Sequence, residues 1–313
     1  MQLESIDGTE YKKIFNRETI VFNTVEFNLL NRSRCDSLEF LLFHDGNKKL
    51  GLIAGIRDGN LSAPFSAPFS CFSVSDSNIR ISYIDNALSL FEEFALSGGT
   101  DSITLVLPPS FYCEALISKI AVCLNKNSFT DFLSVNHHFN TCDYNRYSEG
   151  RMGKDVRYNI KYALKSGLVF KPAEDPDDFS RAYDVIEINK KSKNRPQSMT
   201  FDQIMDMTKI TEVDFLMVMK DDLPVASAII YNHSPEIAQV IYWGDIPEFS
   251  RYYPMNFLAF NIFRFYYEKG TSVIDLGTSM LGNEPNVGLI NFKDNIGAIT
   301  SLKFSFCKQI KKN

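Results

Sequence analysis

The chain has 313 residues, of which 44% are hydrophobic and 23% are charged, and its formal net charge is −5. This composition is typical of a globular protein and excludes a wholly disordered chain. The length suits two domains of about 150 residues each. The acidic balance argues against a protein that is basic over its whole surface and binds nucleic acid by charge alone.

The sequence gives no clear indication of a membrane span, a signal peptide or a metal site. No run of about 18 apolar residues occurs, and the opening MQLESIDGTEYKK does not read as a signal peptide, so we expect a cytoplasmic protein without a membrane span. The six cysteines are scattered and form no C-x-x-C pair, which favours reduced thiols. The four histidines are not at ligand spacing, and we predict no metal site.

Residues 1–146 are predicted to form a first α/β domain. The pattern indicates a strand at 49–57 with a hairpin turn at 58–60, a helix from Ser82 to a Gly98-Gly99 stop, a buried strand at 102–107 and a second helix opened by Pro108-Pro109. The tandem A-P-F-S of residues 62–70 favours an extended edge or loop. Two short strands at 128–135 and 138–143 would follow, with His137 and His138 at an exposed turn between them.

Residues 147–313 are predicted to form a second α/β domain. Its first helix, ending near Lys165, carries a basic stripe that can be a solvated face or a polyanion surface: Lys154, Arg157, Lys161 and Lys165. Asp175 should cap the next helix, and Thr200 with Gln203 should form a capping box. Strands at 213–219, 225–232 and 238–244, a helix at 255–268 and a buried strand at 271–276 complete the pattern.

Two phrases carry a family resemblance. R-Y-N-I-K-Y-A-L-K-S-G-L at 157–168 and G-L-x-x-F-K-x-x-I-G-A at 288–298 resemble the signatures of the FemABX-like aminoacyl and acyl transferases. That resemblance implies two tandem domains of the N-acetyltransferase (GNAT) fold, a mixed α/β architecture with an acceptor cleft between the domains. The long coiled-coil arm of some peptidoglycan-bridge members has no counterpart in the sequence.

The same resemblance indicates where a donor would bind. In GNAT enzymes the loop between the strand at 238–244 and the helix at 255–268 holds the pyrophosphate of coenzyme A, but the usual Q/R-x-x-G-x-G/A pattern is missing from this chain. Arg251 and the helix N-terminus at Met255 and Asn256 are our candidates for a remaining anion site. Arg157 and Lys161 are the second group of candidates. As donor substrate we place acyl-CoA, such as acetyl-CoA, ahead of aminoacyl-tRNA, with no metal.

Three residues are candidates for catalysis. Asp275 could orient the acceptor amine or simply cap its loop, Tyr242 could be a general acid or a core residue, and Lys293 could stabilise negative charge at the carboxyl edge of the sheet. No G-x-S-x-G nucleophile motif occurs, which favours direct attack in a ternary complex. We therefore predict an N-acyltransferase acting on an amino group of a cell-envelope precursor, such as one for peptidoglycan, or of a small metabolite.

The competing prediction is a non-catalytic protein on a degenerate GNAT scaffold that binds a nucleotide-linked sugar or peptide. The missing glycine pattern of the donor loop is the feature that favours it. Under either hypothesis the partner is a small-molecule or nucleotide-linked acceptor, with tRNA as a further candidate.

Overall fold

The computed structural model describes residues 1–46, 48–76, 78–144, 151–195 and 198–310. The chain divides into two compact units, one formed by Met1–Ser134 with Leu302–Asn313 and the other by Val135–Ser301. The boundaries fall inside two long strands, β7 (Thr130–Asn140) and β15 (Ile299–Gln309). The predicted domain limits of 1–146 and 147–313 meet at residues outside the described part of the chain, and they remain a proposal.

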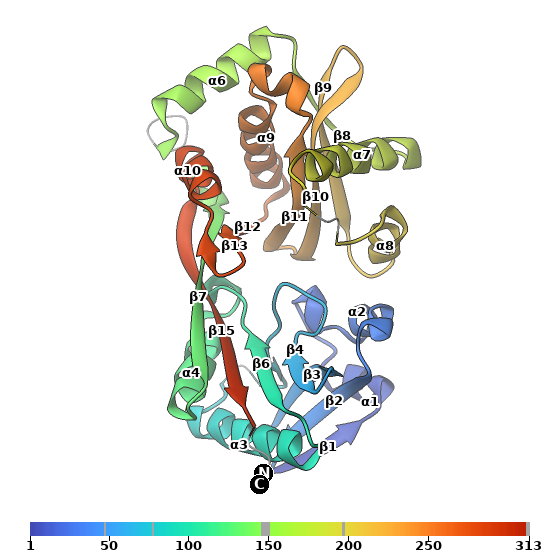
Figure 1. Cartoon of the computed structure of the whole chain (residues 1–313), viewed down its shortest axis with the longest axis vertical. Coiled ribbons are helices and arrows are strands. Elements are labelled where there is room, and N and C mark those ends of the chain that lie inside the picture. The colour runs from blue at the N-terminus through green and yellow to red at the C-terminus, as the bar shows by residue number, and fades with distance from the viewer. Residues whose placement is uncertain (47, 77, 145–150, 196–197, 311–313) are drawn as a thin grey trace. The chain divides into compact units, whose positions relative to one another are not determined.

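The first unit is a mixed sheet with helices on both faces (Figure 1). Its strands follow the order β1-β2-β3-β4-β6-β15, in which only β4 and β6 run parallel. The remaining strands are β1 (Gln2–Ile6), β2 (Ser37–His44), β3 (Lys49–Arg57), β4 (Asn60–Ala63), β5 (Ser73–Val74) and β6 (Ser102–Val106). The helices are α1 (Gly8–Ile14), α2 (Val25–Leu30), α3 (Ile81–Ser97) and α4 (Glu114–Lys126), with short 3-10 turns η1 (Val21–Asn23), η2 (Arg32–Arg34) and η3 (Ser110–Tyr112).

Alternation along β2 explains why both faces of this sheet are covered. Phe40 and Leu42 pack with Tyr11 and Phe15 of the α1 segment, while Leu41 and Phe43 point to the opposite face and are fully buried there. On that opposite face α3 and α4 pack against each other. The predicted apolar stripe of α3 is confirmed: Ile84, Leu88, Phe91 and Ala95 are all fully buried.

The second unit contains a sheet of order β7-β12-β11-β10-β9-β8. Its strands besides β7 are β8 (Val169–Pro172), β9 (Val213–Lys220), β10 (Leu223–Ser234), β11 (Ile237–Asp245) and β12 (Val273–Thr278), with a small ribbon of β13 (Met280–Leu281) and β14 (Glu284–Pro285). Its helices are α6 (Lys154–Lys165), α7 (Pro176–Ser192), α8 (Phe201–Met207), α9 (Pro254–Lys269) and α10 (Val287–Asn295), with η4 (Thr141–Asp143) and η6 (Pro247–Tyr252).

Local signals set the ends of these helices as the sequence predicts. The Asp175 side chain accepts the N–H of Asp178 at the start of α7, and Thr200 and Gln203 form the capping box of α8. Gly270 ends α9 in the left-handed conformation at φ 84°, which glycine adopts without a steric penalty.

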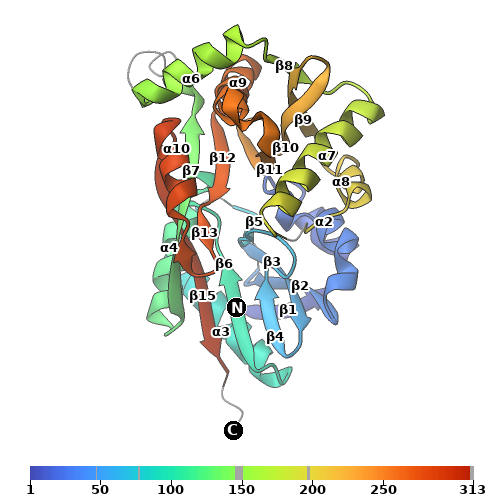
Figure 2. The ribbon, with the colours of Figure 1, turned by 45° about the horizontal axis from the view of Figure 1, so that its top comes forward.

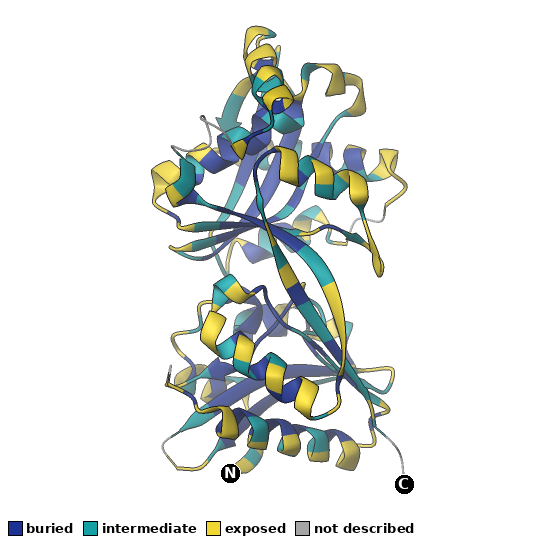
Figure 3. Ribbon diagram, turned by 90° about the vertical axis from the view of Figure 1, so that its left-hand side faces the viewer, coloured by how far each residue is buried: buried dark blue, intermediate teal, exposed yellow. Residues whose placement is uncertain are grey.

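Different helices pack on the two faces of this second sheet (Figure 2). On one face α7 lies across β10 and β11, and Ser227 of β10 donates a 2.6 Å hydrogen bond to the Ala182 carbonyl oxygen of α7. On the other face α9 packs through Phe263, whose ring stacks on Phe139 of β7 at 4.6 Å between centroids. Burying a side chain such as Phe263 stabilises the fold by about 1.5–3 kcal/mol. Figure 3 shows the buried residues following the strands and the exposed residues on the outer sides of the helices.

One prediction about the strands was wrong. The two short strands expected at 128–135 and 138–143 are a single strand, β7, that continues through His137 and His138. Both imidazoles are buried, instead of lying at an exposed turn. Antiparallel pairing with β12 accounts for this, because Asn136, His138, Phe139 and Asn140 all have partners there and the backbone stays extended.

Candidate active site

The β12 strand carries a backbone bulge at the point where the sequence places the signature loop. Asp275 pairs with His138 of β7 and Thr278 pairs with Asn136, so three steps on β12 match two on β7. Gly277 supplies the extra residue with φ 73°, a left-handed conformation that side chains disfavour. The Asp275 carboxylate accepts the Gly277 N–H at 2.8 Å and thereby holds the bulge from one side.

Asp275 is fully buried and is the centre of a polar network between three strands. Besides the Gly277 N–H, its carboxylate accepts the Asn136 amide of β7 at 2.9 Å and the Gln239 amide of β11 at 3.1 Å. Gln239 in turn contacts His233 Nε2 at 3.0 Å. Burial lowers the pKa of His233 to about 4, so this imidazole is neutral at pH 7. A buried carboxylate with three donors is held in one orientation, which suits a positioning role.

Lys293 reaches the same bulge from α10. Its side chain is only 1% exposed, and the ammonium donates to the carbonyl oxygens of Leu276 at 2.9 Å, Gly277 at 2.8 Å and Thr278 at 3.3 Å. These contacts use all three N–H donors of the ammonium. Burial lowers the pKa of Lys293 to about 8, and the nearby Asp275 opposes that shift. From the sequence we predicted that this ammonium faces a ligand, whereas in the structure it donates hydrogen bonds to the loop backbone.

A second histidine contact ties β7 to the loop and to α10. The His137 ring is fully buried, with Nδ1 3.0 Å from the Ser279 hydroxyl and Nε2 3.3 Å from the Asp294 carboxylate. Burial is the main cause that lowers the pKa of His137, with the Lys293 charge adding to it and Asp294 opposing. The loop after β12 is therefore held from β7 as well as from α10.

Tyr242 of β11 lies in the core under α7. Its hydroxyl is hydrogen-bonded to the Ser198 hydroxyl, and the Lys190 ammonium lies 5.5 Å from the centroid of its ring. Burial, reinforced by the neighbouring cations Arg195 and Lys193, lowers the pKa of Lys190. The pairing of β10 with β11 places Tyr242 on the same face of the sheet as Gln239, because Ile229 and Tyr231 are their respective partners. Asp275 belongs to that face through its pairing with Gln239.

The N-terminus of α9 is a candidate anion site. Tyr253 at the N-cap has φ 57° and makes no side-chain capping bond, and Pro254 follows as the first helical residue. Among the described residues, the backbone N–H groups of Met255 and Asn256 therefore lack a capping acceptor, and the helix dipole adds positive potential there. Arg251 is exposed, with its guanidinium 4.9 Å from the Tyr252 ring centroid and bonded to the Tyr252 hydroxyl.

The basic helix α6 packs against the N-terminal end of α9, and it does so with the face opposite its basic stripe. Asn159 donates to the Asn256 side chain at 3.4 Å, and the Tyr162 and Tyr253 rings meet edge to face. Arg157 and Lys161 each lie about 200° around the helix axis from Asn159, at about 100° per residue. The structure thus brings α6 and α9 together but leaves the basic stripe on the opposite side of α6. The stripe and the α9 N-terminus are two separate candidate surfaces.

The edge of β11 that faces β12 is only partly paired. β11 and β12 run parallel and pair only from Ile237 with Val273 to Gln239 with Asp275. Beyond Gln239, no described strand pairs with β11 on that side, and β11 continues to Asp245 before the chain enters η6 and α9. Unpaired N–H and C=O groups of a strand edge can bind an extended ligand.

Asn136 and Gln239 were missed by the sequence analysis. Each is a single polar residue inside a strand, and a polar residue in an apolar run such as Ala238-Gln239-Val240 was the available signal. Among the described residues, no cluster of histidine, cysteine, aspartate and glutamate side chains is suited to hold a metal ion. Within the described part of the chain, the helices are too short or too polar to cross a bilayer.

The chain is similar to known proteins in part of its sequence and in its whole fold. Residues 150–293 match the model of the acetyltransferase (GNAT) domain family. No curated protein sequence matches the chain. Among solved structures, FemX has a TM-score of 0.67 at 10% identity, with 97% of each chain covered. L-PGS from Bacillus licheniformis has a TM-score of 0.61 at 12% identity, covering 99% of this chain and 94% of that one.

A tandem GNAT protein from the clavulanic acid biosynthesis pathway has a TM-score of 0.59 at 9% identity, with both chains covered completely. Residues 150–293 thus match the acetyltransferase (GNAT) domain family, and the chain as a whole shares the fold of the tandem GNAT protein. The predicted fold, a mixed α/β architecture of the tandem GNAT type, is confirmed. The predicted likeness to the FemABX-like group is confirmed at the level of the fold.

Proposed function

We propose that this protein transfers an acyl or aminoacyl group to an amino group of a small or nucleotide-linked acceptor, by direct attack of the amine on the bound donor. The observation that carries the proposal is the open edge of β11, which leads along the chain into the uncapped N-terminus of α9. A donor that combines amide groups with phosphates would fit, with its amides along β11 and its phosphates at the N-terminus of α9. Coenzyme A has both, so acyl-CoA stays ahead of aminoacyl-tRNA as the donor.

The residues available for the donor fit an anion. The N–H groups of Met255 and Asn256 and the guanidinium of Arg251 would hold phosphate oxygens, and the unpaired backbone of β11 would bond the amides of an extended arm. Residues 246–254 contain no glycine, so a phosphate would be held at the helix end and not in a glycine cradle.

The chemistry needs an amine that has lost its proton. Its nitrogen attacks the carbonyl carbon of the donor, the bond to the sulfur or oxygen of the carrier breaks, and the leaving group takes up a proton. Tyr242 remains our candidate for the proton donor. Asp275 and Lys293 act as positioning residues that shape the loop after β12. Holding donor and acceptor together is worth on the order of 7 kcal/mol of the barrier.

The proposal is tested by measuring CoA binding calorimetrically for the parent, Arg251→Gln and the matched control Arg264→Gln. Arg264 is also exposed and lies on α9, where it pairs with Glu268 near the other end of the helix. We expect about tenfold weaker binding for Arg251→Gln, the loss of one charged hydrogen bond, and an unchanged control. Equal CoA binding by both variants would show that Arg251 does not contribute to the donor site.

Activity is tested by following free CoA thiol with acetyl-CoA and a panel of amine acceptors, and by transfer from aminoacyl-tRNA. Mass spectrometry of ligands that co-purify with the protein directs the choice of donor. A CoA species or tRNA supports the transferase. A sugar nucleotide without turnover of either donor supports the second candidate, a non-catalytic binding protein for a nucleotide-linked sugar or peptide, which the glycine-free segment at 246–254 favours.

A further inference from the structure

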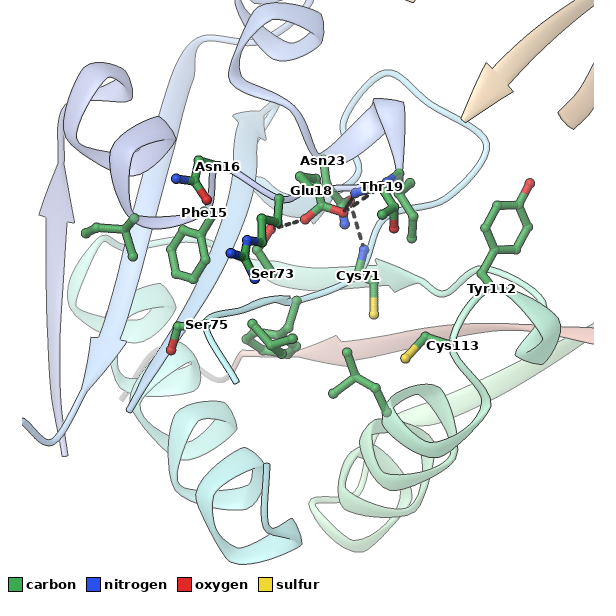
Figure 4. A pocket seen from close by; sticks show the side chains of 16 residues that line it. Phe15, Asn16, Glu18, Thr19, Asn23, Cys71, Ser73, Ser75, Tyr112 and Cys113 are labelled. Carbon is green, nitrogen blue, oxygen red and sulfur yellow. Dashed lines mark hydrogen bonds between the residues drawn. The ribbon is translucent and has the colours of Figure 1, made fainter. Parts of the chain in front are cut away.

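A polar cavity of about 380 Å³ lies within the first unit, and none of the candidate active-site residues lines it. Its wall comes from the segment after α1, from β5 with the residues before it, and from the start of α4. Figure 4 shows it extending from Phe15 to Tyr112, with Glu18, Ser73 and Asn23 gathered in the middle. The acyl-transfer proposal assigns no role to this cavity.

Glu18 is the central polar group of the cavity. One carboxylate oxygen accepts the backbone N–H groups of Thr19 and Ile20, both at 3.0 Å, and the other accepts the Ser73 hydroxyl at 2.5 Å. Ser73 in turn accepts the hydroxyl of the buried Tyr11 at 3.2 Å. A carboxylate has about four acceptor sites, and these three donors occupy three of them.

The part of the chain that the structure describes places no paired cation against this carboxylate. Among the described residues Glu18 forms no ion pair, although Arg17 also lines the cavity. Burial raises the pKa of Glu18, and the hydrogen bonds from Ser73, Ile20 and Thr19, together with the nearby Asn23 amide, oppose that rise. Glu18 is partly exposed, and an ionised carboxylate in such a partly desolvated site is stabilised by a positive group that meets it.

Asn23 adds a donor to the same site. Its side-chain oxygen accepts the Cys71 N–H at 3.1 Å, whereas its amide nitrogen has no hydrogen-bond acceptor in place among the described residues. Asn23 is only 4% exposed, and it lies close enough to the Glu18 carboxylate to lower its pKa. A buried amide N–H₂ without an acceptor is unfavourable, and an oxygen of a ligand in the cavity would satisfy it.

We propose that this cavity binds a small primary amine in its ammonium form, with a carbonyl or hydroxyl oxygen beside the amine-bearing carbon. Glu18 is the counter-ion of the ammonium, and Asn23 donates to the oxygen. An anion is disfavoured by the Glu18 carboxylate. A metal ion is disfavoured because the described residues contain no cluster of ligating side chains.

The test compares two molecules of nearly equal shape, glycinamide and propionamide, which differ in having an ammonium or a methyl group. Dissociation constants are measured by ligand-observed NMR titration of the full chain at pH 7. We expect glycinamide to bind at least about tenfold more tightly, because one charge-assisted hydrogen bond is gained. Equal binding of the two molecules, or no binding of glycinamide, overturns the proposal.

Substitutions of single residues test whether glycinamide binds beside Glu18. Glu18→Gln should weaken glycinamide binding about tenfold, whereas Glu10→Gln, which removes an exposed carboxylate of the same unit, should leave it unchanged. Arg17→Gln should bind glycinamide as well as the parent or better, because a competing cation is removed. Loss of binding in Arg17→Gln, or full binding in Glu18→Gln, contradicts the assignment.

The parent protein gives an independent measurement if Glu18→Gln does not fold. Protonation of Glu18 removes the counter-ion, so glycinamide affinity should fall as the pH is lowered through the raised pKa of Glu18. Propionamide binding should not follow that change. A glycinamide affinity that stays constant down to the acid unfolding transition would refute the role of Glu18.

Discussion

Asp275 and Lys293 bind the same residue from its two sides: the Asp275 carboxylate accepts the N–H of Gly277, and the Lys293 ammonium donates to the Gly277 carbonyl oxygen, each at 2.8 Å. One buried anion and one buried cation therefore fix the two polar groups of the bulged glycine. The bulge lies where β12 leaves β11, so this pair sets the shape of the opening at the edge of β11. Its effect on catalysis would be indirect, through the position of the loop.

Lys293→Met should destabilise the protein. The substitution keeps the aliphatic stem but leaves three buried carbonyl oxygens without their donor, a loss of about 2 kcal/mol. The measurement is urea unfolding, with Lys191→Met as control, because Lys191 is 71% exposed and pairs only across one helical turn. An unfolding free energy equal to that of the parent would show that the clamp is not needed for stability.

The stability of the parent should also depend on pH through Lys293. The pKa of Lys293 is about 8 in the folded protein, below its ordinary value of 10.5, so between these values the unfolded chain binds more protons. Stability therefore rises with pH in this window, by up to about 1.4 kcal/mol per pH unit, and is lost as the pH falls through 8. The difference between parent and Lys293→Met, measured from pH 7 to 10, isolates this contribution. A difference that does not change with pH contradicts the lowered pKa.

Asp275→Asn should be more damaging than a surface change of the same kind. The new amide would set its N–H₂ group against at least one of the donors from Asn136, Gln239 and Gly277, at a cost of about 2–3 kcal/mol. Asp184→Asn, an exposed position on α7, is the control and should change stability by less than about 0.5 kcal/mol. Thermal and urea unfolding give the comparison, and similar values for both variants would argue against the network.

Tyr242→Phe separates a catalytic from a structural role. Loss of the hydroxyl contact to Ser198 should cost about 1 kcal/mol of stability. If Tyr242 donates the proton, turnover should fall by about a hundredfold with little change in KM. Tyr231→Phe is the matched control, since Tyr231 is also buried and its hydroxyl contacts only Met199 sulfur, at 3.7 Å, among the contacts shown by the structure. Equal turnover of both variants would exclude Tyr242 as the acid.

The basic stripe on α6 should contribute to binding a polyanion. Lys154, Arg157, Lys161 and Lys165 form no ion pair among the described residues, and three of them are exposed. The quadruple change to Gln should weaken tRNA binding and reduce its salt dependence by about one unit of slope per lost phosphate contact. A control with Lys191, Lys193, Lys209 and Arg264 changed to Gln carries the same net charge. Identical salt dependence of both proteins would make the stripe a solvated surface.

The sequence by itself determined the local elements of this protein. Helix faces such as Ile84 to Ala95, the cap at Asp175 and the capping box at Thr200 depend on residues within a few positions of each other, so their pattern is visible along the chain. The order of these elements, with the two signature phrases, was enough to predict a tandem GNAT fold. The same signals placed Asp275 and Lys293 in one segment that we predict to be functional.

Only the tertiary structure decided what those residues contact. Asn136 lies 139 residues before Asp275, and their hydrogen bond depends on the register between β7 and β12. That same pairing keeps His137 and His138 inside one extended strand, where the sequence indicated a turn. Lys293 binds carbonyl oxygens because the bulge at Gly277 turns them toward α10, and the partly buried Glu18 carboxylate is held because Ser73 meets it from another segment. Contacts of this kind follow from strand register and packing, which no local pattern encodes.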